Sequence, residues 1–182
     1  MKSEIEIFLF QEFDKKNLHQ RIQSLLSHLL QRSISDGDFL KNSHGKPFLK
    51  DHSLYFNISH TKNYALLAVS KDTPVGIDIE SIRTDIDSAK LSQRFFCDTE
   101  NVWVGDNHEK FCVLWTRKEA FIKAVGRGLS MGLNNIDVLE PIVFYENQKW
   151  KIDNIDLKLD GYRAAVCGVG GDWCIRINSV GA

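Results

Sequence analysis

Several features that place a protein in a special class are missing from this sequence. Its longest apolar runs fall far short of the roughly 20 residues that a membrane-spanning helix needs. The amino terminus, M-K-S-E-I-E-I-F-L-F, alternates after a charged start and lacks both a long apolar segment and a small-residue cleavage site. With 43% hydrophobic and 26% charged residues in 182 positions, the chain predicts an ordinary globular protein without membrane association, which we expect in the cytoplasm.

Cysteine usage gives no sign of a structural metal or of a disulfide framework. The chain has four cysteines, none in C-x-x-C spacing, and two of them fall in runs that resemble core segments. A chain of this length does not need disulfides for stability. We therefore expect reduced thiols at Cys97, Cys112, Cys167 and Cys174.

The common nucleotide-binding fingerprints are also absent. Gly45-Lys46-Pro47 lacks the G-x-x-x-x-G-K-[ST] spacing of a phosphate loop, and Gly126 and Gly128 do not form a dinucleotide motif. A nucleoside triphosphatase of the common kind is therefore not predicted. The two later glycines are better suited to ending a helix and shaping a turn.

Charge is nearly balanced overall, at a net −1, but its sign changes along the chain. Seven basic residues stand against two acids in 15–50, nine acids against three basic residues in 72–109, and five basic residues against one acid in 110–127. A polyanionic ligand with a bound cation would suit this order, with basic flanks for phosphates and an acidic middle for the metal. The alternative is that most of these charges are simply solvated.

Apolar periodicity predicts a mixture of helices and strands. Helical spacing runs through 18–30, 87–96 and 109–125, with Asp14 and Gly126 as candidate caps. Residues 31–47 and 97–108 are predicted to be irregular. Strands are predicted at 4–10, 54–58, 64–70, 75–80, 142–145, 155–159, 162–169 and 173–178. Each half has one long helix beside several strands, which indicates an α+β fold of two similar units that meet near residues 71–76.

Acidic residues in two predicted elements are candidates for a metal site. In V-G-I-D-I-E at 75–80, strand periodicity puts Asp78 and Glu80 on one face and the apolar residues on the other. Glu119 on the helix 109–125 would complete a three-carboxylate site suited to Mg²⁺. The ordinary interpretations are a solvated strand face and, for Glu119 and Lys123 four residues apart, a surface ion pair of about 0.3–0.5 kcal/mol.

His60 ends F-N-I-S-H at the end of a predicted strand, where a side chain is free to face a cleft. A single histidine is more often structural than functional. Ser59 and His60 are neighbours on a strand and point to opposite faces, which argues against a nucleophilic pair. Ligand binding is the better prediction for both.

Five blocks occur in order between residues 44 and 129: H-G-K-P-F-L, F-N-I-S-H-T, V-G-I-D-I-E, R-F-F-C-D-T-E and W-T-R-K-E-A-F-I-K-A-V-G-R-G-L. Together they resemble the 4′-phosphopantetheinyl transferases of the surfactin-synthetase-activating type. The resemblance implies an α+β pseudo-dimer in which each half packs a long helix on a small, mostly antiparallel sheet. The halves would be residues 1–73, on the coenzyme A-binding side, and 74–182, with the metal-binding acids and the catalytic helix.

The resemblance also implies roles for individual residues. Asp78, Glu80 and Glu119 match the metal-binding acids, and Lys123 matches the phosphate-contacting lysine. Glu119 would also act as the base for the serine nucleophile. Glu100 matches a further acid of the family. Coenzyme A would be bound by Lys46, Pro47, Ser59 and His60, with Lys15, Lys16 and Arg21 as candidates for its 3′-phosphate.

The activity implied is Mg²⁺-dependent transfer of the phosphopantetheine arm of coenzyme A to a serine of an apo acyl or peptidyl carrier protein, releasing adenosine 3′,5′-bisphosphate. We expect a monomer that does not act on nucleic acid. Two alternatives stay open. One is a Mg²⁺-dependent nuclease, which the missing E-x-K partner after Glu80 disfavours. The other is a non-catalytic module that binds coenzyme A or a carrier protein.

Overall fold

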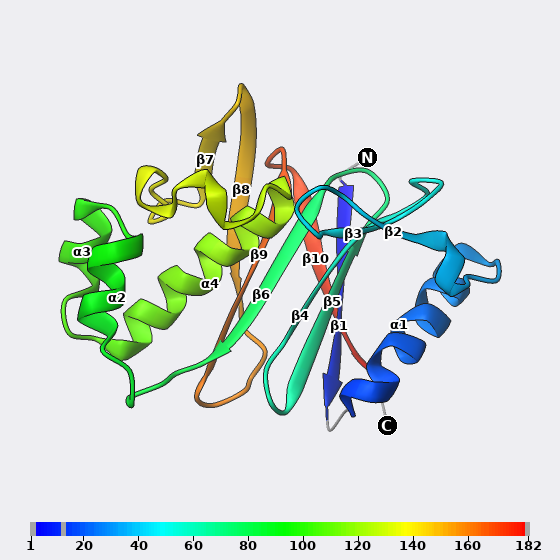
Figure 1. Ribbon diagram of the computed structural model, residues 1–182, viewed down its shortest axis with the longest axis horizontal. Helices are drawn as coiled ribbons and strands as arrows, with labels where there is room; N and C mark the ends of the chain where they lie inside the picture. Colours follow the sequence, from blue (N-terminus) through cyan, green and yellow to red (C-terminus); the bar gives the residue numbers. More distant parts are fainter. Residues whose placement is uncertain (1–2, 12–13, 181–182) are drawn as a thin grey trace.

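Two four-stranded sheets, each covered by one long helix, form the main body of the protein (Figure 1). The computed structural model describes residues 3–11 and 14–180, except for the side chains of residues 15, 16, 129 and 130. The strand orders are β10-β1-β5-β4 in the first sheet and β6-β9-β8-β7 in the second. The layers run from α1 through the two sheets to α4, so the predicted α+β class is confirmed.

The first sheet is built mostly from the amino-terminal part of the chain. It contains β1 (Ser3–Gln11), β4 (Tyr55–His60), β5 (Tyr64–Ser70) and β10 (Trp173–Val180). The first three pair antiparallel, whereas β10 pairs parallel with β1. Phe8 and Phe10 of β1 pack with Ile22 and Leu26 of α1 (Lys15–Leu30). Because successive residues of a strand point to opposite faces, these two phenylalanines share the face that the helix covers.

The second sheet carries the acidic strand. It contains β6 (Val75–Ser81), β7 (Ile142–Tyr145), β8 (Gln148–Ile155) and β9 (Tyr162–Val169), all antiparallel. Helix α4 (His108–Val125) covers its outer face, with Ala120, Phe121 and Ala124 packed against Ile152 and Ala165. The opposite face contributes to the core between the two sheets.

The two halves share one chain path. In each, a first strand leads to the long helix and then to a hairpin whose last strand returns beside the first: β1, α1 and β4–β5 in one half, β6, α4 and β8–β9 in the other. This repeat supports the predicted pseudo-dimer. The division at residue 73 stays a prediction, and β10 returns from the carboxyl-terminal end to complete the first sheet.

A continuous apolar core joins the inner faces of the sheets. Ile5, Ile7 and Leu66 from the first sheet meet Ile77 and Ile79 from the second, all at most 1% exposed. Burial of such side chains stabilises the fold by about 1.5–3 kcal/mol each. At the front of the molecule, β4 and β6 run side by side as the facing edges of their sheets (Figure 1).

Helix α4 has clear end signals and one tight contact. Asn107 caps its first turn by accepting a hydrogen bond from the Lys110 amide at 2.9 Å, and Gly126 ends it in a left-handed conformation, as predicted. Gly76 of β6 lies directly against it, because a Cβ at this position would be 2.1 Å from the Ala120 carbonyl oxygen. The acidic strand and the helix therefore approach more closely than any other residue would permit.

Some elements differ from the predictions. Residues 98–104 form a helix, α3 (Asp98–Val104), after α2 (Ser88–Phe95), where an irregular segment was expected. The strand expected at 155–159 lies earlier, as β8. The predicted loop 31–47 contains a short 3₁₀ helix (Asp36–Asp38) and β2 (Phe39–Lys41), which pairs with β3 (Pro47–Leu49). Two more 3₁₀ turns, Gly128–Met131 and Leu133–Asn135, follow α4.

The structure also bears on the cysteines and on membrane-spanning helices. All four cysteines are free thiols, as expected. Among the described residues, no helix is both long enough and apolar enough to cross a membrane.

Candidate active site

Strand β6 presents its acids to helix α4. Val75, Ile77 and Ile79 are buried in the core between the sheets, so the alternating Asp78 and Glu80 face the helix side, as predicted. Asp78 is only 2% exposed. A carboxylate this deeply buried requires partners of positive charge.

Lys123 of α4 is the cation that contacts Asp78. Its Nζ lies 2.6 Å from Asp78 Oδ1 and also donates a hydrogen bond of 3.1 Å to the hydroxyl of Ser59. Among the described ion pairs, Lys123 is joined to Asp78 and not to Glu119, so the simple helical pair between Glu119 and Lys123 is not formed. The lysine instead links the helix to the acidic strand.

Negative charge exceeds positive charge around Lys123. Burial, followed by the nearby Asp78 carboxylate, raises the pKa of Glu80 to about 7. Burial, followed by Asp78, also raises the pKa of Glu119. One oxygen of Asp78, Oδ2, is buried and has no hydrogen-bond partner. Three acids thus share one lysine, and one of their buried oxygens has no donor.

This arrangement fits a divalent cation bound by oxygen ligands. Asp78, Glu80 and Glu119 offer hard carboxylate donors, and an ion would supply both the missing charge and a partner for Asp78 Oδ2. Among the described residues, these three do not form a group with ligand atoms all within 4.8 Å of one another. Their assignment as metal ligands stays a prediction.

A cleft of about 280 Å³ opens beside Glu119 and Lys123, between the two halves. One side is helix α4 and the turn after it, and the other is the loop before β3 together with β4. Four of the residues predicted for the site line it, namely Lys46, Pro47, Glu119 and Lys123. Seven further residues complete it, three of them glycines: His44, Gly45, Asn57, Ile58, Ile122, Gly126 and Gly128.

Lys46 holds the loop against the carboxyl end of α4. Its Nζ donates to the carbonyl oxygens of Ala124 at 3.0 Å and of Val75 at 3.1 Å, and burial lowers its pKa to about 8. Asn42 makes a similar contact, from Nδ2 to the Gly126 carbonyl at 2.8 Å. These contacts fix the loop along one side of the cleft.

Ser59 and His60 separate as predicted for neighbours on a strand. Ser59 is 8% exposed and donates to Asp78 Oδ1 at 2.7 Å, whereas His60 is exposed at the end of β4. Neither residue lines the cleft. The side chains of Lys15 and Lys16 lie outside the described residues, and Arg21 stacks its guanidinium 5.1 Å from the centre of the Phe10 ring.

Glu80 does not line this cleft but borders another, more apolar pocket of about 190 Å³, which extends from the acidic strand toward α2. Phe111, Cys112 and Trp115 of α4 form its wall. The Cys112 thiol lies 3.7 Å from the Glu80 carbonyl oxygen, and burial raises its pKa to about 12, so it is a packing residue and not a nucleophile.

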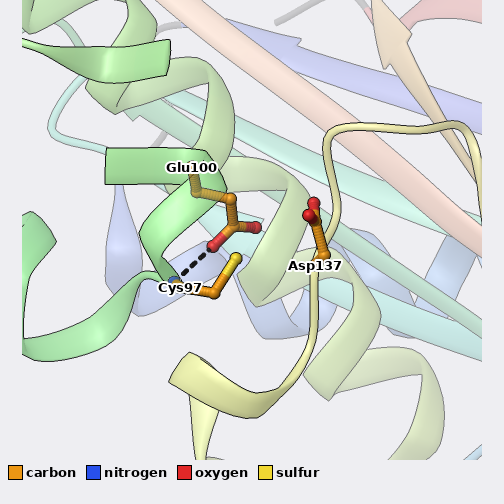
Figure 2. Close-up of side chains that lie close together, drawn as sticks. All are labelled: Cys97, Glu100 and Asp137. Carbon is orange, nitrogen blue, oxygen red and sulfur yellow. Dashed lines mark hydrogen bonds between the residues drawn. The ribbon is translucent and has the colours of Figure 1, made fainter. Parts of the chain in front are cut away.

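Glu100 lies in a different cluster with Cys97 and Asp137, the only group of potential metal ligands within 4.8 Å among the residues described (Figure 2). Its two oxygens are already occupied. Oε2 accepts from the Cys97 amide at 2.9 Å and pairs with Lys118 at 2.7 Å, and Oε1 accepts from the Val138 amide at 2.9 Å. With Lys118 only 1% exposed beside it, this fully satisfied carboxylate is structural and a cation would be repelled.

Two other basic residues of α4 fit neither interpretation of the charge order. The sequence favours either a basic flank for phosphates or solvated charges at 110–127, but Arg117 and Lys118 are buried. Arg117 donates to the carbonyl oxygens of Val138 at 2.6 Å and Glu140 at 2.7 Å, and Lys118 to that of Leu133 at 2.7 Å. They anchor the segment after the helix and leave Lys123 as the cation at the acids.

Asn57 is a site residue that the sequence motif contained but to which no role was assigned. It lies on the same face of β4 as Ser59, borders the cleft, and accepts a hydrogen bond from the Ile77 amide at 2.9 Å. Its position two residues before Ser59 on a strand was the available signal, because such residues share a face.

Comparison with known proteins gives consistent matches. Residues 74–167 match the model of the 4′-phosphopantetheinyl transferase superfamily, a range that begins one residue before β6 and includes all three acids and Lys123. The chain is 33% identical over 172 residues to the 4′-phosphopantetheinyl transferase gsp of Aneurinibacillus migulanus, an alignment that covers 84% of this chain and 71% of that protein.

Other relatives carry related names. The 4′-phosphopantetheinyl transferase Sfp of Bacillus subtilis strain 168 is 37% identical over 123 residues, covering 64% of this chain and 54% of its own length. The 4′-phosphopantetheinyl transferase HetI of a Nostoc species is 32% identical over 165 residues, covering 84% of this chain and 69% of its own length.

Proposed function

Because the chain belongs to the 4′-phosphopantetheinyl transferase superfamily, we propose that it transfers the 4′-phosphopantetheine arm of coenzyme A to a serine of an apo carrier protein. The observation that carries this proposal is the meeting of Glu119 and Lys123 with the Lys46-Pro47 loop in one cleft between the halves, with Asp78 held at Lys123. The coproduct is adenosine 3′,5′-bisphosphate.

The cleft supplies positions for the diphosphate of coenzyme A. Lys46 and Pro47 form the side from the first half, and Lys123 lies opposite on α4. The serine hydroxyl attacks the phosphorus that carries the pantetheine arm, and negative charge builds on the departing bisphosphate. Lys123 stabilises that charge, a contribution that in comparable sites is worth roughly 10²–10³-fold in rate.

The three acids are the proposed ligands of Mg²⁺. Asp78, Glu80 and Glu119 would hold the ion, which when bound neutralises the diphosphate and helps to orient it. The excess of carboxylates around a single lysine and the unpartnered Asp78 Oδ2 support this role.

Glu119 is the proposed general base. It borders the cleft, and its pKa is raised by burial and by Asp78, so its carboxylate accepts a proton more readily than an exposed one would. Taking the proton from the serine hydroxyl, directly or through a water, typically contributes about 10²–10⁴-fold.

The carrier protein and the setting are further parts of the proposal. We infer an acyl or peptidyl carrier as the acceptor, and a cytoplasmic enzyme that acts as a monomer because one chain supplies both sides of the cleft. The relatives described above are all named as transferases, which favours transfer over the nuclease alternative.

The test is incubation of the protein with coenzyme A, Mg²⁺ and a panel of apo carriers from fatty-acid, polyketide and peptide synthesis, followed by intact-mass measurement. We expect at least one carrier to gain one phosphopantetheine arm. If calorimetry shows coenzyme A binding while no carrier in the panel gains the arm, the protein is a binding module. Cleavage of plasmid DNA by the purified protein would instead favour the nuclease.

Variants connect that activity to the site. Asp78→Ala and Glu119→Ala proteins should remain folded but lose transfer, because both acids are proposed metal ligands. Glu109→Ala is the matched control, since Glu109 lies at the start of the same helix and pairs with Arg163 on the surface. Near-normal turnover by both acid variants in Mg²⁺ would show that the site is assigned wrongly.

A further inference from the structure

The two sheets meet along β4 and β6 without a backbone ladder between them. These strands lie side by side at the facing edges of their sheets, yet within the described part of the chain each forms backbone ladder pairs only with strands of its own sheet. The amides on the open edge of β6 are nevertheless buried, because Ile77 and Ile79 lie in the core between the sheets. Buried amides require acceptors, so another group must supply them.

Side chains of β4 supply these acceptors. Asn57 Oδ1 accepts from the Ile77 amide at 2.9 Å, and Ser59 Oγ accepts from the Ile79 amide at 3.4 Å. The two side chains are 5% and 8% exposed and lie on one face of their strand. We call Asn57 and Ser59 the polar seam, since together they replace a backbone ladder between the halves.

The seam also reaches the proposed metal ligand. The Ser59 hydroxyl donates to Asp78 Oδ1 at 2.7 Å and accepts from Lys123 Nζ at 3.1 Å. Asp78 Oδ1 therefore has two donors, the hydroxyl and the ammonium, while Oδ2 has none. The orientation that leaves Oδ2 available is fixed by groups from both halves of the protein.

A count of hydrogen bonds distinguishes this role from direct substrate binding. A serine hydroxyl has one proton and two lone pairs. In Ser59 the proton goes to Asp78, and the lone pairs accept from Lys123 and from the Ile79 amide. No capacity remains for coenzyme A, the ligand expected for Ser59 from the sequence.

We propose that Asn57 and Ser59 are positioning residues that align β6 and hold Asp78 for metal binding, and that the Ser59 hydroxyl does not bind coenzyme A. This inference rests on the proposed function, because it assigns the seam to the metal ligand of that reaction. Groups that orient a metal ligand in this way commonly change metal affinity or activity about 10–100-fold when removed.

The test compares Ser59→Ala, Ser59→Thr and the control Ser70→Ala. Ser70 is a buried serine of the same sheet whose hydroxyl accepts from the amides of Asp72 and Thr73, away from the acids. The first readout is the Mg²⁺ dissociation constant, measured by NMR titration without coenzyme A. The second is the pair of kinetic constants, kcat and the KM for coenzyme A, measured in transfer.

We expect Ser59→Ala to weaken Mg²⁺ binding about 10–100-fold and to lower kcat, with the KM for coenzyme A little changed. Ser59→Thr retains the hydroxyl and should recover Mg²⁺ binding, and Ser70→Ala should bind Mg²⁺ as the wild type does. A raised KM with unchanged Mg²⁺ affinity would overturn the proposal in favour of a coenzyme A ligand. Equal Mg²⁺ affinity in Ser59→Ala and Ser70→Ala would overturn it in favour of a packing role.

Amide exchange tests the other half of the seam. Asn57→Ala removes the acceptor of the Ile77 amide, so this amide should exchange faster with solvent, while that of Ile5 in the centre of the first sheet should not. Unchanged protection of Ile77 would contradict the seam. The Mg²⁺ and exchange readouts need no transfer, so they distinguish failure of this inference from failure of the proposed enzymatic activity.

Discussion

At the scale of single residues, Lys123 has a different partner from the one that sequence spacing suggests. Glu119 and Lys123 lie one helical turn apart, yet Lys123 contacts Asp78 and Ser59 on neighbouring strands. Spacing along a helix shows which residues share its face, but not what the facing strand offers them. The lysine therefore joins three elements at the proposed phosphate site.

Replacement of Lys123 separates catalysis from surface pairing. Lys123→Ala should reduce transfer roughly 10²–10³-fold, because the leaving bisphosphate loses its nearest cation. It should also lower the free energy of unfolding by about 1–3 kcal/mol without Mg²⁺, since the buried Asp78 carboxylate then loses the cation that contacts it and keeps only the Ser59 hydroxyl. Steady-state kinetics and urea denaturation measure the two effects.

The control for that variant is Lys110→Ala on the same helix, whose Nζ contacts only the Trp103 carbonyl and ring among the described contacts. It should retain both activity and stability. Normal transfer by Lys123→Ala, with only a small change in stability, would return Lys123 to the role of an ordinary surface ion.

Glu80 should make stability depend on pH. Its pKa is raised from 4.5 to about 7 in the folded protein, first by burial and then by Asp78. The folded state therefore binds more protons than the unfolded state between these values, and stability must fall as pH rises through that window. The free energy of unfolding of the metal-free wild type, measured relative to that of Glu80→Gln, should be highest at and below pH 4.5. It should decline as the pH rises to about 7.

Denaturant titrations of the wild type and Glu80→Gln in the presence of a chelator, at a series of pH values, measure this difference. Added Mg²⁺ should restore stability to the wild type most strongly above pH 7, because binding requires the ionised carboxylate. A stability difference that does not vary with pH would show that Glu80 ionises normally.

At the scale of elements, buried charges fasten α4 to the segment that follows it. Glu100 of α3, Lys118 of α4 and the amide of Val138 form one bonded cluster. The sequence contains these charges but does not show their burial. The sequence therefore places Glu100 in a family motif but does not reveal its partners.

Removal of one member of this ion pair should be costly. Glu100→Gln is expected to destabilise the protein by about 3–5 kcal/mol, because Lys118 stays buried without its counterion. The double variant Glu100→Gln/Lys118→Met should recover part of that loss. Urea denaturation of the single and double variants measures the coupling, and equal stability of wild type and Glu100→Gln would exclude the structural role.

The contact between β6 and α4 depends on the absence of a side chain at position 76. In Gly76→Ala the new Cβ would lie 2.1 Å from the Ala120 carbonyl oxygen, so the helix with Glu119 must move away from the acidic strand. We expect a loss of about 1–3 kcal/mol in stability together with weaker Mg²⁺ binding.

Gly37→Ala is the control, since the nearest atom to its new Cβ would be 3.7 Å away and its backbone is not left-handed. Thermal denaturation with and without Mg²⁺ compares the two variants. Similar behaviour of both would mean that the close approach at Gly76 does not position the site.

Most long elements were predictable because one face of each is buried. The helix 109–125 and the strands at 64–70 and 75–80 appear almost unchanged as α4, β5 and β6. Helix α3 was not predicted because it lacks a single apolar stripe: its apolar residues Val102 and Trp103 lie on the exposed side. The alternating apolar residues Ile155, Leu157 and Leu159 indicated a strand, but only the first lies in one, and β8 occupies the residues before it.

At the scale of the whole molecule, the candidate site depends on both halves. The blocks that carry the family resemblance identify most of the residues around the cleft, including Lys46, Glu119 and Lys123. They do not reveal that β4 and β6 meet through Asn57 and Ser59, because a contact between sheet edges leaves no period in either sequence. Nor do they show that β10 returns to the first sheet.

Transfer of the phosphopantetheine arm in this cleft is the claim on which the other predictions depend. The most direct measurement quantifies modified carrier and adenosine 3′,5′-bisphosphate in one reaction with coenzyme A and Mg²⁺, beside a carrier whose acceptor serine is replaced by alanine. We predict that the two products form in equal amounts with the serine carrier and that neither forms with the alanine carrier. Bisphosphate release without carrier modification, or no product despite coenzyme A binding, would contradict the claim.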